Sequence, residues 1–326
     1  MTGPTSIRRR KLLLGTGAGL VSVGTFAQQN AYPTKPVRIV VPFAAGTASD
    51  SLTRLIAEGL AERLKQPVLV ENRPGAGGTV GTELASRSPH DGYTLLMAAT
   101  PNVAINPTLY ASSSLEPDKA FRAVGMVASA ANVIVAGNHM PFSDFPGMLS
   151  YARANPRKLT FATYAVGSTG HLAGAMLNAR AGVDLLHVAA GDPLSLAVGE
   201  HVQLAFVTPT ATLPLVRSGK LKALAVTSAK RLGIAPDIPT VSESGLRHFS
   251  AVAWYGYVVP RRTPDEIVRV LEAHLQSTIR SAKFETFART SGNEITWLGS
   301  DEFSSYMESE RIKWGEAVRR SGARAE

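Results

Sequence analysis

Two turns made of small side chains contain the residues of this sequence that are best suited to hold a ligand. Each turn lies between a predicted strand and a predicted helix, after residues 37–41 and 158–163. Small residues let a ligand approach the backbone, and the first N–H groups of a helix lack partners within the helix. The two turns therefore predict a clamp for a small anion. The candidate contacts are Phe43, Ala45, Gly46, Thr47, Ser49 and Asp50 in the first turn and Ala165, Gly167, Ser168, Thr169 and His171 in the second.

The elements around these turns follow from the pattern of apolar residues. Residues 37–41 are β-branched except for Arg38, which is typical of a strand inside a parallel sheet. Leucine and isoleucine recur at helical spacing over residues 52–64, with Ser49 or Asp50 as the expected N-cap. Residues 99–102 form another small-residue loop after a strand, and this loop adds Thr100 to the candidate contacts.

Ser168 and His171 lie three residues apart and can fall on one helix face, so a secreted α/β hydrolase that uses this pair stays open as an alternative. The spacing around Ser168 is not the Gly-x-Ser-x-Gly of a nucleophile elbow. A histidine at such a position more often caps or packs than acts as a base. Asp50 can serve as a base in principle, but a helix N-cap needs it equally. No residue is therefore predicted to be catalytic.

Metal and cofactor chemistry is not predicted. The seven histidines never pair at i,i+3 or i,i+4, so no metal-binding helix face is visible. Residues 75–80 read Gly-x-Gly-x-x-Val, without the third glycine or the acidic ribose partner of a dinucleotide site, and are read as an ordinary turn. The absence of cysteine excludes disulfides, thiolate nucleophiles and zinc–thiolate centres.

Composition favours a globular protein that binds small anions. Of 326 residues, 44% are hydrophobic and 18% are charged, which is enough apolar material for about two domains. The formal net charge is +9, and four of these charges lie in Arg8-Arg9-Arg10-Lys11. The other charges are scattered and have no aromatic ladder beside them. This pattern argues against nucleic acid as a partner.

Residues 1–27 are predicted to be an export signal. The basic run at residues 8–11 precedes an apolar, glycine-rich stretch of about 15 residues, shorter than the roughly 20 that span a bilayer. Small residues at the end of this stretch predict cleavage after Ala27, and an uncleaved membrane anchor is the alternative. The arginine run fits a twin-arginine signal nearly as well as a general secretory signal, so the route stays open.

Strands and helices alternate along the rest of the chain, which predicts an α/β fold with mainly parallel sheets. Because strand-turn-helix units occur in both halves, we expect two domains with a cleft between them. Two crossings, near residues 127–131 and 250–254, divide the chain into one domain of residues 32–128 plus 251–326 and another of residues 129–250. The strands are predicted at residues 37–41, 67–72, 93–98, 124–129, 132–136, 158–163, 184–189, 202–207, 221–227 and 253–259.

Several stretches carry a family resemblance. They are residues 32–43 (YPTKPVRIVVPF), 66–78 (QPVLVENRPGAGG), 91–96 (DGYTLL), 104–110 (AINPTLY), 220–231 (KLKALAVTSAKR) and 236–241 (PDIPTV). They resemble the Bug-type solute-binding receptors of tripartite tricarboxylate transporters, and the resemblance covers nearly the whole chain after the export signal.

This resemblance implies a two-domain periplasmic receptor of the "Venus flytrap" type, without catalysis and without a cofactor. It also implies a small organic anion, a carboxylate, held largely by the backbone of residues 43–49 and 165–169. The expected partners are the membrane subunits of a transporter. A sensor that passes its ligand to a membrane kinase stays open as an alternative.

The sequence departs from the family pattern at three places. Residues 47–50 read Thr-Ala-Ser-Asp where the family has a second glycine and a Ser-Thr-Asp run. Residues 189–192 read Ala-Ala-Gly-Asp where a Pro-Tyr-Lys-Gly type of segment is usual. Val207 or Thr208 stands where the family usually has aspartate. These departures leave the identity of the ligand open.

Overall fold

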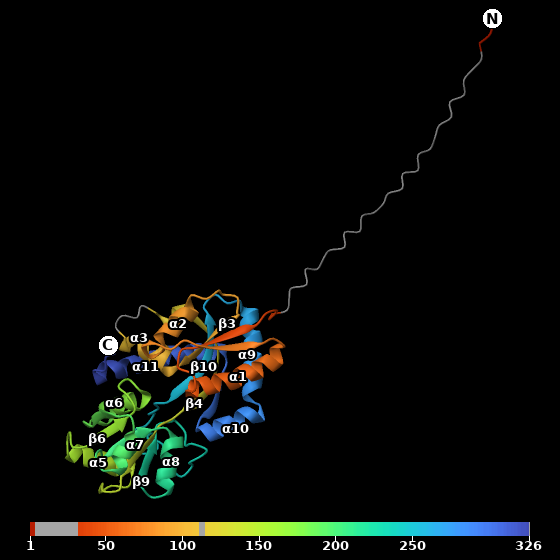
Figure 1. Cartoon of the computed structure of the whole chain (residues 1–326). Helices are drawn as coiled ribbons and strands as arrows, with labels where there is room; N and C mark the ends of the chain where they lie inside the picture. Colours follow the sequence, from red (N-terminus) through yellow and green to blue (C-terminus); the bar gives the residue numbers. More distant parts are fainter. Residues whose placement is uncertain (4–31, 111–114, 326) are drawn as a thin grey trace. The chain divides into compact units, whose positions relative to one another are not determined.

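The chain from Tyr32 onward builds two β-sheets from alternating strands and helices (Figure 1). The computed structural model describes residues 1–3, 32–110 and 115–325. The predicted export signal therefore lies outside the described residues, apart from its first three positions. Within the described part of the chain, no helix combines the length and apolar character needed to cross a membrane.

The first sheet combines strands from residues 37–130 with strands from residues 253–298. It combines strands from the orange-to-yellow and the blue parts of Figure 1. In spatial order it contains β11 (Glu294–Leu298), β4 (Phe121–Ala130), β10 (Ala253–Pro260), β3 (Thr94–Ala99), β1 (Val37–Val41) and β2 (Val68–Asn72). The second sheet comes from the middle of the chain. It contains β7 (Leu186–Ala189), β6 (Thr160–Thr163), β8 (Leu204–Val207), β5 (Val133–Gly137) and β9 (Leu221–Val226).

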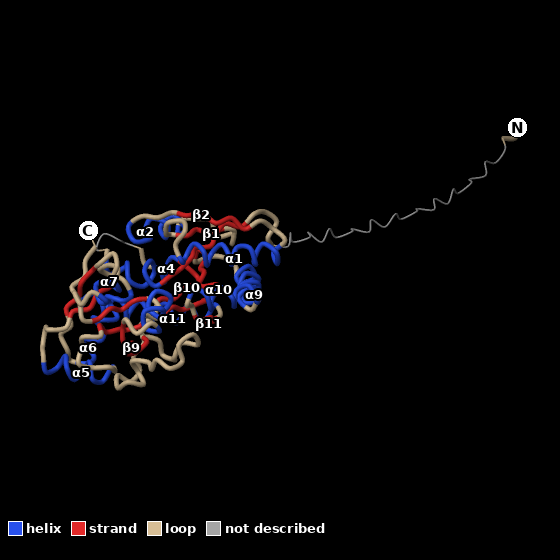
Figure 2. The backbone as a smooth tube through the Cα atoms, turned by 60° about the horizontal axis from the view of Figure 1, so that its bottom comes forward, coloured by secondary structure: helices blue, strands red, loops and turns tan. Residues whose placement is uncertain are grey.

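Helices connect most of these strands, as Figure 2 shows. Two short helical turns, η1 (Ala76–Gly78) and the π-helical η2 (Thr100–Ile105), precede helices of the first sheet. The α-helices are α1 (Ala48–Leu64), α2 (Thr79–Ser86), α3 (Asn106–Leu109), α4 (Pro117–Ala120), α5 (Phe145–Ala154), α6 (Thr169–Ala181), α7 (Pro193–Val198), α8 (Pro209–Arg217), α9 (Asp265–Ile279), α10 (Ala282–Ser291) and α11 (Ser300–Ser321).

The strand directions are mixed, although most strands of each sheet run one way. β1 is parallel to β2 and β3, and β6 is parallel to β7 and β8. In contrast, β10 is antiparallel to β3 and β4, β11 is antiparallel to β4, and β5 is antiparallel to β8 and β9. The prediction of mainly parallel sheets therefore needs this correction. The chain enters the second sheet through β5 and returns to the first through β10. Neither strand is connected to a neighbouring strand by the crossover helix that parallel pairing requires, so both can run antiparallel.

Apolar clusters hold the helices on the sheets. α1 and α9 pack side by side over the first sheet, around Ile39, Leu60 and Leu271 (Figure 2). Gly59 permits this close approach, because a Cβ atom there would overlap the Thr278 side chain of α9. Another cluster includes residues of both sheets and of α6 and α11, which contact each other. The burial of apolar surface is thus continuous between the two sheets.

Two segments carry the chain between the sheets, and hydrogen bonds through Thr227 join them. The chain leaves β4 at Ala130 and enters β5 at Val133, and it returns after β9 to begin β10 at Ala253. The Asn132 N–H donates to Thr227 Oγ1 at 2.9 Å, and the Thr227 N–H donates to the Asn132 carbonyl at 3.0 Å. The Ala251 N–H donates to the Thr227 carbonyl at 2.9 Å. The two crossings therefore lie beside each other.

A buried carboxylate fixes the place where the returning segment joins the first sheet. Glu310 of α11 is 4% exposed and accepts hydrogen bonds from the indole N–H of Trp254 at 3.1 Å and of Trp314 at 2.7 Å. Lys313 pairs with its other oxygen and also donates to the Ser250 carbonyl at 3.3 Å. A buried carboxylate needs such partners to offset its lost hydration. This network ties α11 to the start of β10.

Three elements differ from the sequence-based expectation. β11 was not predicted, because it is a short edge strand without regular alternation of buried and exposed residues. α8 was not predicted either, and it contains Pro214 in its interior. Residues 99–102 were expected to form a loop, but η2 and α3 make this region helical from Thr100 to Leu109. Burial of Val103, Ala104 and Ile105 stabilises that helical segment.

Candidate functional site

The first loop, defined as residues 43–49, turns the chain from β1 into α1. Gly46 is exposed and has a φ of +81°, a left-handed conformation that suits glycine. The N-cap of α1 is Thr47, whose Oγ1 accepts a hydrogen bond from the Asp50 N–H at 3.3 Å. The expected cap was Ser49 or Asp50, so the helix begins earlier than predicted. A β-region φ and ψ at Thr47 allow this residue to cap the helix.

Asp50 supports the first loop from within the protein. It is 3% exposed, and its carboxylate accepts hydrogen bonds from the Gly46 N–H at 2.9 Å, the Asn72 amide at 2.9 Å and Arg54 Nε at 3.0 Å. Burial by itself raises the pKa of this carboxyl, but the hydrogen bonds from Arg54, Gly46 and Asn72 outweigh burial and lower the pKa. Asp50 is therefore ionised at neutral pH and holds the loop, rather than standing free as a base.

The second loop, defined as residues 165–169, turns the chain from β6 into α6. Gly167 has a φ of +77°, and Ser168 caps the helix by accepting a hydrogen bond from the His171 N–H at 3.3 Å. A Cβ atom on Gly167 would lie 2.7 Å from Cδ2 of Leu109, in α3. Position 167 thus requires glycine both for its backbone conformation and for space.

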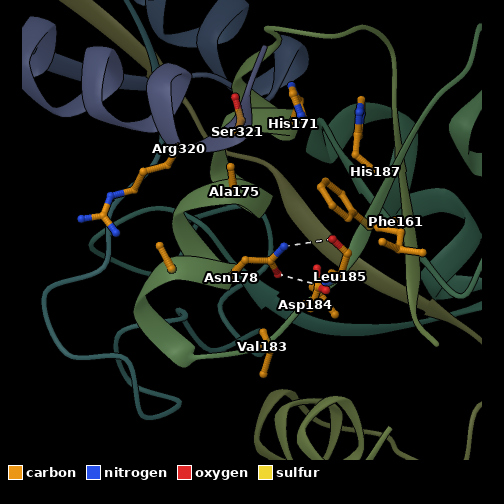
Figure 3. A pocket seen from close by; sticks show the side chains of 12 residues that line it. Phe161, His171, Ala175, Asn178, Val183, Asp184, Leu185, His187, Arg320 and Ser321 are labelled. Atoms are coloured by element: carbon orange, nitrogen blue, oxygen red, sulfur yellow. Dashed lines mark hydrogen bonds between the residues drawn. The ribbon is translucent and has the colours of Figure 1, made fainter. Parts of the chain in front are cut away.

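His171 supports the second loop and stacks on another histidine, as Figure 3 shows. Its Nδ1 accepts a hydrogen bond from the Gly167 N–H at 3.0 Å, and its ring lies 3.9 Å from the ring of His187 with 26° between the planes. Burial lowers the pKa of His171. Burial and the neighbouring His171 lower the pKa of His187 to about 4. Both rings are therefore neutral at neutral pH.

The two loops share one design. Each has a glycine at positive φ, followed directly by a hydroxyl residue that is the N-cap of the helix. The side chain of the fourth residue after the glycine accepts a hydrogen bond from the glycine N–H. Asp50 and His171 were predicted to cap a helix or to contact the ligand, and this supporting role was not predicted. The recurring spacing, Gly46 to Asp50 and Gly167 to His171, was the available signal.

Ser168 and His171 are not arranged as a nucleophile and its base. The Ser168 hydroxyl donates to Thr163 Oγ1 at 3.3 Å and accepts from the backbone, not the ring, of His171. The His171 Nδ1 accepts its hydrogen bond from the Gly167 N–H. Among the hydrogen bonds of the described residues, none joins an imidazole to the Ser168 hydroxyl. This geometry lacks the serine–imidazole hydrogen bond that activates a nucleophile.

Not all the predicted contact residues are accessible. Thr100 is fully buried and its Oγ1 accepts a hydrogen bond from the Trp254 N–H at 2.8 Å, so its hydroxyl supports the start of β10. Of the other candidates, Ala45, Gly46 and Ala165 are exposed, Phe43, Thr47, Ser49, Ser168 and Thr169 are half-buried, and Asp50, Gly167 and His171 are buried.

The glycine-rich turn at residues 75–81 supports the first loop. A Cβ atom on Gly78 would lie 3.2 Å from the ring of Phe43, and one on Gly81 would lie 2.9 Å from the Cα of Pro42. The Asn106 side chain donates to the Gly77 carbonyl at 2.9 Å and fixes the turn. Close packing beneath the first loop therefore explains these glycines.

The cavities found among the described residues do not lie between the two loops. One cavity has a volume of about 530 Å³ and lies between α6, the segment leading into β7 and the end of α11. His171 and His187 form part of its wall (Figure 3). Neither this cavity nor three others in the described part of the chain, near α6 and α11, Leu109 and Arg122, are lined by residues of both loops. No group of three or more acidic or histidine side chains among the described residues is placed to hold a metal ion.

Comparison with known proteins gives a family match and close structural likenesses. The family model described as "Tripartite tricarboxylate transporter family receptor" matches residues 52–323. The periplasmic binding protein BugD is 32% identical in sequence, with a TM-score of 0.69, and the match covers 90% of this chain and 100% of that chain.

Two similar structures contain ligands. Rpa4515 of R. palustris, solved with adipate, is 30% identical with a TM-score of 0.72, over 89% of this chain and 98% of its own. MatC of Rhodopseudomonas palustris, solved with malate, is 28% identical with a TM-score of 0.70, over 88% of this chain and 100% of its own. These likenesses confirm the predicted two-domain α/β fold of periplasmic binding proteins.

Proposed function

Because the chain belongs to the receptor family of the tripartite tricarboxylate transporters, we propose that it captures a small carboxylate with its two glycine loops and delivers it to the membrane subunits of such a transporter. The predicted resemblance to Bug-type receptors is confirmed by the family match and by the likeness to BugD. A solute-binding receptor carries out no catalysis and needs no cofactor.

The paired design of the two loops is the observation that carries this proposal. Gly46 and Gly167 each lead directly into a capped helix, α1 or α6, of 17 or 13 residues. The N–H groups of the first turn have no partner within a helix, and the helix dipole favours a negative charge there. Neither loop contains lysine or arginine. The ligand charge is therefore recognised by backbone N–H groups of both loops.

The relatives indicate the class of ligand and the compartment. Rpa4515 and MatC were solved with adipate and malate, both dicarboxylates, and BugD is a periplasmic binding protein. The basic and apolar sequence of residues 8–26 fits an export signal that brings the present chain to the same compartment. A dicarboxylate that contacts one loop with each carboxylate matches the presence of two similar turns.

We expect a dicarboxylate to raise the melting temperature of the mature chain, residues 28–326. A ligand at 100 times its dissociation constant adds about 2.7 kcal/mol to the free energy of unfolding, and thermal-shift assays detect such a change. A panel of carboxylates that includes adipate and malate is the probe. Adipamide, the uncharged diamide of adipate, is the matched control and is expected to give no shift.

Two outcomes of this assay contradict the proposal. The first is a panel of carboxylates without any stabilising member. The second is turnover of a carboxylic ester by the purified chain that disappears in Ser168→Ala, because this result favours the hydrolase.

We further propose that two domains close around the ligand. One domain contains residues 32–128 and 251–326, and the other contains residues 129–250. The adjacent crossings joined through Thr227 suit a hinge, because few backbone dihedral angles must change there. A ligand shifts this equilibrium only if it binds the closed form more tightly. We therefore expect small-angle scattering to give a smaller radius of gyration with a saturating carboxylate than without it. An unchanged radius at saturation refutes the closing motion while leaving binding intact.

A further inference from the structure

The two glycine loops differ in the chemistry of the side chain that holds them. The Gly46 N–H is held by a carboxylate of lowered pKa, whereas the Gly167 N–H is held by an imidazole nitrogen. We propose that His171 is a positioning residue that keeps the second loop in its binding conformation only while its ring is neutral, so that acidification releases the second loop but not the first.

The hydrogen bond itself requires the neutral ring. Nδ1 of His171 accepts from Gly167 at 3.0 Å, so this nitrogen must carry a lone pair and no proton. In the imidazolium both ring nitrogens are donors, and two N–H groups then face each other across the same short distance. The Gly167 N–H loses its acceptor, and the peptide at residues 166–167 must move.

The position of the ring in the helix adds a second penalty for its protonation. His171 is in the first turn of α6, directly after the cap at Ser168. The positive end of the helix dipole lies there, and it disfavours a further positive charge. Asp50 occupies the equivalent position in α1, where its negative charge is favoured.

Groups packed around the ring do not compensate a positive charge. The ring of His187 stacks on one face, and its Nε2 is 2.7 Å from the Thr163 hydroxyl. Asp184 and Arg320 line the same cavity from the segment before β7 and from α11. Figure 3 shows the guanidinium of Arg320 directed away from both rings.

The charged groups of this cavity are also engaged with other partners. Arg320 pairs with Glu316 at 2.7 Å, and Asp184 lies 3.8 Å from Arg157. On the side of α3, the apolar side chain of Leu109 faces Gly167. Among the described residues, no carboxylate is hydrogen-bonded to the His171 ring, and burial lowers its pKa.

Two substitutions separate the acceptor from the aromatic ring. In His171→Asn the side-chain oxygen takes the place of Nδ1, one bond beyond Cγ, and accepts from Gly167 without titrating. In His171→Phe the ring and its stacking on His187 remain, but the acceptor is lost at every pH. His171→Asn thus keeps the acceptor for the Gly167 N–H at every pH, whereas His171→Phe has no acceptor at any pH.

The test on the ligand-free protein follows the backbone amide resonances of Gly167 and Gly46 by ¹⁵N NMR from about pH 8 to about pH 4, because burial lowers the pKa of His171 below the ordinary value for histidine. We expect the Gly167 resonance of the wild type to move as the pH falls, and the Gly46 resonance to stay in place. In His171→Asn the Gly167 resonance is expected to stay in place as well. Movement of the Gly167 resonance in His171→Asn, or none in the wild type, overturns the proposal.

The consequence for binding rests on the proposed function and is measured separately, with adipate and malate as probes. We expect the ratio of dissociation constants, wild type to His171→Asn, to rise about three- to tenfold from neutral to acidic pH, as the loss of one hydrogen bond predicts. Titration of the ligand cancels in this ratio. A ratio that does not change, or that falls, contradicts the proposal. If neither probe binds, adipate and malate are excluded as ligands, but the NMR result still decides the role of His171.

Discussion

Gly167→Val is expected to abolish stabilisation by a carboxylate ligand while leaving the far-ultraviolet circular dichroism close to that of the wild type. The backbone at this position has a φ of +77°, which a β-branched residue resists, and its first side-chain carbon would lie 2.7 Å from Leu109. Left-handed strain and overpacking together cost roughly 2–5 kcal/mol. The second loop relieves this cost by moving, and its N–H groups then no longer converge on the ligand.

Gly182→Val is the matched control for this experiment. Gly182 is the C-cap at the other end of the same helix, α6, with a φ of +64° and no atom within 4 Å of a Cβ position. This variant carries the same type of backbone strain, about 1–2 kcal/mol, without disturbing the loop. We expect it to melt earlier than the wild type yet to keep the full ligand-induced shift. Normal binding by Gly167→Val would place the ligand elsewhere in the protein.

Glu310→Ala is expected to have the largest effect on stability, a loss of roughly 3–5 kcal/mol in the free energy of unfolding. The substitution removes the acceptor of the Trp254 and Trp314 indole groups and the partner of Lys313. Both indole N–H groups then stay buried without an acceptor, beside a cavity of the size of the lost side chain. Because Trp254 is the second residue of β10, directly after the second crossing, we expect the loss to loosen the contact between α11 and the returning segment. Denaturant unfolding of the ligand-free protein measures it.

Glu316→Ala provides the comparison on the same helix. Glu316 pairs with Arg320, and the two side chains are 56% and 59% exposed. An exposed pair contributes about 0–1 kcal/mol, so this variant is expected to unfold nearly as the wild type does. Equal losses in Glu310→Ala and Glu316→Ala are inconsistent with a structural role for the buried network.

Local sequence was sufficient to predict the strand, turn and helix on either side of each loop. Residues 37–41 form β1 as expected, and helices start within a few residues of the predicted positions after Gly46 and Gly167. These features depend on apolar periodicity and on the permissive backbone of glycine, both of which act over a few neighbouring residues. The family resemblance, read from contiguous stretches, was equally accessible and is confirmed.

Only the tertiary structure decided what surrounds the loops. Thr100 was a candidate ligand contact, but its hydroxyl binds the backbone of Trp254, 154 residues later in the sequence. The directions of β5 and β10 follow from crossings between sheets, which no local pattern encodes.

The support of the second loop likewise depends on distant residues. The space at Gly167 is limited by Leu109 of α3, and the ring of His171 rests on His187 of β7. Glycine spacing identifies where a loop turns, because a turn is set by its own dihedral angles. The order of the strands in the sheets decides which side chains reach that turn. Burial and neighbouring groups then decide the protonation state of those side chains.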